Sequence, residues 1–146
     1  MKTIKFEIVT PERTVLKQEI LQISVPTTSG EITILPDHIP LVSIIKAGVI
    51  EIKKVDNSFE IISVSSGFIE VMKDKVVILA DTAERAEELD EQKIEEARLR
   101  AEEVKKNAKF VDDVEFAKIS AQIETELARL HAVNKWRRLK GQDNKK

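Results

Sequence analysis

The chain offers few side chains that could carry out covalent chemistry. It has two histidines and no cysteine, which rules out thiolate catalysis, disulfides and cysteine-ligated zinc within it. A nucleophile also needs an adjacent base and a group that orients this base. His38 follows Asp37 in a loop, where a histidine is more often a surface or hydrogen-bonded residue, and His131 is isolated. We therefore expect no enzyme active site and no metal site in this chain.

Charged side chains form a more informative pattern. Acids outnumber bases between Glu84 and Glu103, whereas bases outnumber acids from Arg129 to the end of the chain. The net charge of −2 argues against general nucleic-acid binding. The basic end has two interpretations that the sequence leaves open. It can bind an acidic partner, or it can simply suit the C-terminal end of a helix dipole.

The composition is that of one domain, or of a small domain with an appendage. Hydrophobic residues make up 42% of the 146 positions and aromatic residues only 4%, so Ile, Val and Leu must fill most of the core. No apolar run approaches the roughly 20 residues that span a bilayer. Charges close to the N-terminus leave no room for the apolar stretch of a signal peptide. We expect no direct insertion into a membrane.

The chain changes character at Asp81. All four prolines and three of the four glycines precede this residue, and neither type occurs from Phe68 to Lys140. Before the break, short segments such as Gly30–Ile34 and Val49–Lys53 alternate apolar and polar residues between turn signals. This pattern is typical of a β-sandwich or a small barrel. We predict an antiparallel β-sandwich at the N-terminal end.

The second part predicts two helices that form an antiparallel hairpin. Asp90 can cap the first helix, whose apolar stripe is thin and rich in alanine, so we expect it to dock weakly. A bend at Phe110–Asp113 follows, and Asp112 has the capping-box spacing to Glu115. The second helix has a fuller stripe that ends at Trp136. The expected boundaries are a sandwich over 1–81, a linker over 82–87, a helical hairpin over 88–140 and a disordered tail over 141–146.

The segment Gly30–Val42, which reads GEITILPDHIPLV, carries a family resemblance. It resembles the epsilon subunit of rotary proton-translocating ATP synthases, and its Pro-acid-His-x-Pro-Leu core is the specific part. Ala47–Ile50, Val64–Val71 and Val76–Glu84 also match, so the resemblance covers almost the whole chain. It implies a non-catalytic subunit of the central stalk that links the gamma subunit to the c-subunit ring. It also implies a peripheral place on the cytoplasmic face of the cell membrane, within the ATP synthase complex.

The resemblance implies contact residues on the sandwich and on the arm. Glu31 would face the c-ring loops, His38 and Ser43 would lie against gamma, and Ser65 would join that second face. In this family the hairpin either folds on the sandwich or extends into the catalytic alpha/beta hexamer, where it blocks ATP hydrolysis. Acidic segments of the hexamer would then meet the basic residues of the second helix, an attraction that salt weakens. These residues are Arg129, Lys135, Arg137 and Arg138.

Some members of the family also bind ATP at the hairpin. Their motif is an aliphatic residue, Asp, two variable residues, then Arg-Ala, and this chain keeps Asp90 but has Lys93 and Ile94 in the last two positions. Arg129 matches one of two arginines in the second helix, whereas Thr125 occupies the place of the other. Lysine lacks the planar fork that recognises phosphate. We therefore expect no cofactor, with ATP as at most a weak regulatory ligand of Asp90, Lys93 and Arg129.

Two other functions remain as alternatives. One is an ATP-sensing module that works through the hairpin, which direct nucleotide binding to the isolated protein would reveal. The other is an adaptor for nucleic acid or an acidic partner that uses 129–146. The adaptor predicts a steep salt dependence on DNA or RNA, which is not expected of a near-neutral chain whose first part has no evident basic patch.

Overall fold

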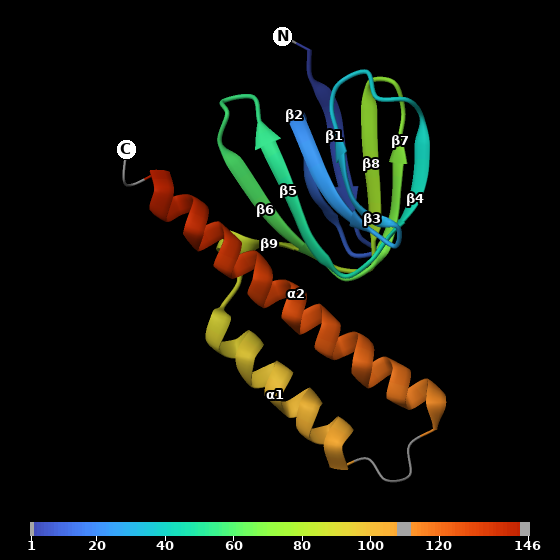
Figure 1. The fold of residues 1–146 in the computed structure, drawn as a ribbon, viewed down its shortest axis with the longest axis vertical. Coiled ribbons are helices and arrows are strands. Elements are labelled where there is room, and N and C mark those ends of the chain that lie inside the picture. Colours follow the sequence, from blue (N-terminus) through green and yellow to red (C-terminus); the bar gives the residue numbers. More distant parts are fainter. Residues whose placement is uncertain (1, 108–111, 144–146) are drawn as a thin grey trace.

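The computed structural model describes residues 2–107 and 112–143. The described chain begins with strands and ends with helices, as Figure 1 shows. Its strands are β1 (Ile4–Val9), β2 (Thr14–Thr27), β3 (Gly30–Ile34), β4 (Leu41–Ile45), β5 (Gly48–Lys54), β6 (Phe59–Val64), β7 (Gly67–Val71), β8 (Lys75–Ala80) and β9 (Ala83–Arg85). Its helices are the short 3₁₀ helix η1 (Ala86–Glu88), α1 (Glu91–Asn107) and α2 (Asp113–Asp143).

The strands form two packed layers that share the long strand β2. The first half of β2 pairs with β1, and its second half pairs with β3 and β5. One layer continues through β5 to β6 and β9, and the other runs from β1 through β8 and β7 to β4. Only β1 and β8 pair in parallel among the described strands. The predicted β-sandwich is confirmed, with this one departure from antiparallel pairing.

Aliphatic side chains fill the space between the layers. In β1, for example, Ile4, Phe6 and Ile8 are buried, and the charged residues between them point outward. Burial of this apolar area is the main favourable term in folding. The composition therefore predicted correctly that aliphatic residues would supply the core. The largest fully buried members of this core are Phe6, Ile8, Ile20, Ile23, Ile34, Ile45, Ile50, Ile52, Ile62, Ile69 and Ile78.

Two boundaries differ from the sequence prediction. The segment 82–87 was expected to be a linker, but β9 lies within it and pairs with the last residues of β6. Ala83 and Ala86 are buried there, so this segment belongs to the folded body. The tail was expected to begin at Gly141, but α2 continues to Asp143. An exposed glycine costs a helix only about 1 kcal/mol, which does not end it; 144–146 lie outside the described residues.

The helices begin where the sequence predicts. The Asp90 side chain accepts hydrogen bonds from the backbone N–H groups of Gln92 (3.0 Å) and Lys93 (3.3 Å). Asp112 accepts one from the N–H of Glu115 at 2.8 Å. Each cap satisfies backbone donors that have no partner within the helix. Part of the predicted bend, 110–111, lies outside the described residues.

The C-terminal half of α2 packs on the outer face of β5 and β6. Ile61 and Ala132 are buried in this contact, and Trp136 packs against them. The first half of α2 and most of α1 project beyond the end of the sandwich (Figure 1). As a result β6 is covered on both faces, whereas none of the described helices covers β4, β7 or β8 (Figure 1). The structure thus shows the arm docked on the sandwich through the second half of α2.

Candidate functional site

The layer opposite the arm has an apolar row on its outer surface. Ile44, Phe68 and Leu79 lie side by side on β4, β7 and β8, and Val9 of β1 extends the row. The first three are 53%, 55% and 55% exposed. Because side chains alternate along a strand, their neighbours Ile45, Ile69 and Ile78 point into the core. We call Val9, Ile44, Phe68 and Leu79 the Phe68 face.

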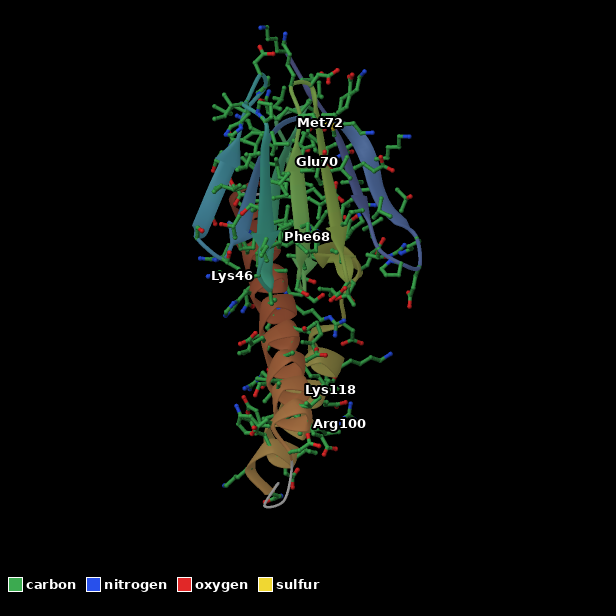
Figure 2. All side chains as sticks on the ribbon, turned by 90° about the vertical axis from the view of Figure 1, so that its right-hand side faces the viewer. Lys46, Phe68, Glu70, Met72, Arg100 and Lys118 are labelled. Atoms are coloured by element: carbon green, nitrogen blue, oxygen red, sulfur yellow. The ribbon has the colours of Figure 1, made fainter. Side chains whose placement is uncertain are left out.

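A groove of about 390 Å³ runs beside this row. It is lined mainly by apolar groups from the end of β1 and from the adjoining ends of β7 and β8, including Pro11 and Gly67. Figure 2 is turned toward this side, and it shows Phe68 and Glu70 along β7 with α2 behind the sheet. Contiguous exposed apolar surface of this kind marks a site of protein association. The Phe68 face is therefore a candidate docking surface.

Two predicted contact residues lie at the end of the sandwich where β2 turns into β3. Glu31 is exposed on β3, beside the pair Thr27 and Gly30. Ser65 lies at the same end, because Thr27 pairs with Ile45 and Ile45 pairs with Gly67. The Ser65 hydroxyl accepts a hydrogen bond from the backbone N–H of Thr82 at 3.0 Å. Ser65 thus connects two loops, and Glu31 presents a carboxylate to solvent.

The other two predicted contacts are not placed together with this pair. His38 is half-buried in the loop after β3, where its Nδ1 lies 2.7 Å from the Ile39 carbonyl oxygen. Ser43 is half-buried and pairs with the buried Ile69, so it shares the inward register of β4. The side chain of Ser43 therefore lies on the inward side of β4, and its contact with gamma stays a prediction. The exposed positions of that strand are Val42 and Ile44.

The loop that carries His38 is tied to the start of the chain. Asp37, which has a positive φ of 63°, forms an ion pair with Lys2. The hydrogen bond from Lys2 and its charge hold the pKa of Asp37 below the ordinary value. A lowered pKa means that the pair contributes stability above the unfolded pKa, and that this contribution disappears as pH falls through the folded pKa.

Replacing Lys2 with alanine is expected to raise the pKa of Asp37 toward its ordinary value. Lys73→Ala is the matched control, because Lys73 is the weakest of the causes that lower this pKa. A carboxyl titration followed by NMR would measure both. If the pKa of Asp37 were the same in Lys2→Ala and in the wild type, Lys2 would not be paired with Asp37 in solution.

The arm cations that were predicted to reach a partner are largely paired within the chain. Arg129 donates to both oxygens of Glu84 at 2.6 Å and, through Nη1, to Glu126 at 2.6 Å. Lys135 pairs with Glu51 of β5, and Arg137 pairs with Glu91 of α1. Arg138 is exposed, and the structure gives it no ion pair among the described residues. In this position of the arm, three of the four cations already have carboxylate partners.

The candidate residues for ATP are engaged in other ways. The Asp90 carboxylate caps α1, Lys93 is exposed, and the guanidinium of Arg129 is bound by two carboxylates. The hydrogen bond from Arg129 to Glu84 raises the pKa of the guanidinium above its ordinary value. A phosphate group would have to displace Glu84 and Glu126 from it. In this arrangement the guanidinium of Arg129 is already occupied by carboxylates, and weak ATP binding stays a prediction.

Sequence reasoning missed the Phe68 face and the pairing of the arm. The face was detectable, because Leu41–Ile45 is apolar on both sides of the strand and Phe68 has the outward parity of β7. The partner of Arg129 lies 45 residues away in the chain, and no local pattern indicates it. Within the described residues, no group of three or more ligand side chains could hold a metal ion. None of the described helices is long and apolar enough to cross a bilayer.

Comparisons with known proteins agree with this architecture. The model of the ATP synthase delta/epsilon chain beta-sandwich domain matches residues 3–86. The chain is 40% identical to the ATP synthase epsilon chain of Herpetosiphon aurantiacus, over 87% of this chain and 95% of the other. It is 48% identical to that of Bacillus subtilis, over 70% and 77%.

A solved structure shows the same fold. A chain in the mitochondrial ATP synthase of Euglena gracilis, an assembly of OSCP, F1 and c-ring, matches 88% of this chain with 79% of its own length. The TM-score is 0.75 at 20% identity. The β-sandwich, the helical hairpin and the relatives all indicate the same family. The chain belongs to the epsilon chains of the ATP synthase, which are non-catalytic subunits of that complex.

Proposed function

We propose that this chain links the gamma subunit to the c-subunit ring in the central stalk, and that its C-terminal helices restrain ATP hydrolysis. One observation carries this proposal: the sandwich has an exposed apolar face on one side and a docked, ion-paired arm on the other. A subunit built in this way can hold one partner permanently while the arm changes position. Inter-domain contacts of modest size are mobile by default.

Each proposed partner has a surface that suits it. The Phe68 face is assigned to gamma, because apolar anchors with a polar rim make stable interfaces. The end of the sandwich that carries Glu31 is assigned to the c-ring loops. The basic residues of α2 are assigned to acidic segments of the alpha/beta hexamer. Solved relatives that are named as F1/c-ring and central stalk/c-ring assemblies support these partner assignments. We further propose a peripheral place on the cytoplasmic face of the membrane.

The test is ATP hydrolysis by the reconstituted catalytic head with gamma. We expect the full chain to bind and inhibit, and a chain that ends at Leu89 to bind without inhibition. This end point keeps β9 and the buried Ala86 in the fragment. If both forms bind and neither inhibits, the chain couples rotor parts and the arm has another role. If neither binds, the proposed place in the stalk is wrong.

A further inference from the structure

The loop between β3 and β4 carries the most exposed large apolar side chain of the described residues. Ile39 in this loop is 75% exposed, and Val42, near the start of β4, is 69% exposed. Val42 has the same outward register as Ile44, so exposed apolar side chains continue from the loop along β4 to the Phe68 face. Contiguous apolar surface marks a site of protein association. Residues 36–39, which we call the Ile39 loop, therefore extend this candidate docking surface.

The backbone of the Ile39 loop depends on side-chain contacts for its orientation. Pro36 and Asp37 form a turn, and Asp37 has a φ of 63°. A positive φ at the second central position of a turn usually takes glycine or asparagine, and aspartate tolerates it better than most other residues do. Within the described part of the chain, no backbone hydrogen bond joins residues 36–39 to another segment. Polar contacts that hold this loop must therefore come from side chains.

Lys2 supplies such a contact from the start of the chain, which lies at the end of the sandwich opposite to α1 (Figure 1). Its ammonium group donates a hydrogen bond to the carboxylate of Asp37 and forms an ion pair with it. The segment that carries Lys2 is itself fixed. Ile4 is buried in the core, and the backbone N–H of Lys5 donates to the carbonyl oxygen of Asp74 at 2.9 Å. The ion pair therefore joins the Ile39 loop to the folded body of the sandwich.

The exposure of this ion pair limits what it can do. The side chains of Lys2 and Asp37 are 77% and 47% exposed, and exposed ion pairs contribute little to the stability of a fold. A short loop with few other contacts needs only a small bias to prefer one orientation over another. Lys73 also lowers the pKa of Asp37, but it is the weakest of the listed electrostatic influences on this carboxyl group, and Lys2 is the strongest. Lys73 is therefore a poor substitute for Lys2.

We propose that Lys2 is a positioning residue for the binding of gamma, because through Asp37 it holds the Ile39 loop in the orientation that presents Ile39 to that subunit. The assignment of this surface to gamma rests on the proposed function. Lys2 acts by reducing the number of loop conformations that binding must order, and it requires no contact with gamma itself. Asp37 then has two roles, the left-handed backbone and the ion pair. Asparagine keeps the first role and removes the second.

The hold on the loop can be measured in the isolated chain, without any other subunit. Pro36 has no N–H group, so the Ile39 loop has three amides whose ¹⁵N heteronuclear NOE reports their motion. We expect these values to fall in Lys2→Ala and in Asp37→Asn, to stay as in the wild type in Lys2→Arg, and to stay unchanged in β4 and β7 throughout. Lys5→Ala is the matched control, because Lys5 pairs with a different carboxylate. Wild-type values in Lys2→Ala would overturn the proposal, whatever the chain binds.

Titration of gamma with the full chain then tests the positioning. We expect Lys2→Ala and Asp37→Asn each to lower affinity by about two- to fivefold. The double variant should lose no more than either single variant, because both remove the same ion pair. Ile39→Ala should weaken binding further, and in that background Lys2→Ala should have no additional effect. An equal effect of Lys2→Ala with and without the Ile39 side chain would overturn the positioning role, as would wild-type affinity in Ile39→Ala.

Failure of the proposed function has a different signature. If the wild-type chain does not bind gamma at all, the place in the stalk and the positioning role are both wrong, whereas the NOE values still decide whether Lys2 holds the loop. If the wild type binds and Lys2→Ala binds equally well despite a loosened loop, the proposed function stands and the positioning role is overturned.

Discussion

Replacing Phe68 with glutamate is expected to weaken the binding of gamma strongly and to leave the chain folded. Phe68 lies in the middle of the Phe68 face, between Ile44 and Leu79, and more than half of its side chain is exposed. The substitution therefore removes little intrachain packing, but it places a charge where an apolar partner surface would have to desolvate it. Central aromatic anchors of interfaces commonly contribute 2 kcal/mol or more, so we expect affinity to fall by roughly 30-fold or more.

Isothermal titration of gamma with the purified variant would measure this loss. Leu99→Glu is the matched control, because Leu99 is also apolar and 52% exposed but lies on α1. Circular dichroism must show that both variants keep the wild-type spectrum. If Phe68→Glu binds gamma as tightly as the wild type does, gamma does not use this face, and the assignment of the two sides of the sandwich must change.

The sequence was sufficient for the parts of the fold that have a strong local signal. Period-two alternation located the strands, and Asp90 and Asp112 marked the helix starts because each supplies a cap within its own turn. β9 was not predicted, because alternation over three residues cannot be distinguished from chance. Gly141 led to a predicted helix end that is too early, because a single glycine lowers the stability of a helix but does not by itself end it.

The site was less predictable, because it depends on contacts between distant segments. The charge of Arg129 was visible in the sequence, but its pairing with Glu84 requires β9 and α2 to meet. Glu126 is charged, yet it is buried, because burial depends on the surface that the helix meets. Ser43 is a different case. The resemblance supplied its position, whereas alternation with Ile44 indicates that its side chain lies on the inward side of β4.

Replacing Gly67 with alanine is expected to lower the free energy of unfolding by roughly 3 kcal/mol or more. A Cβ at this position would lie 2.0 Å from the carbonyl oxygen of Leu79 and 2.8 Å from the Cα of Ala80. Both atoms belong to the backbone of β8, so no side-chain rotation can relieve the overlap. The pairing of β7 with β8 must open at this end.

Urea unfolding followed by far-UV circular dichroism would measure the loss. Gly141→Ala is the control, because a Cβ there meets no atom within 4 Å and should stabilise α2 by about 1 kcal/mol. A destabilisation below about 1 kcal/mol for Gly67→Ala would show that β8 can move aside. The expected loss also has a functional consequence, since Phe68 and Leu79 adjoin the overlapping atoms. Gamma binding should therefore weaken in this variant even at temperatures at which the chain remains folded.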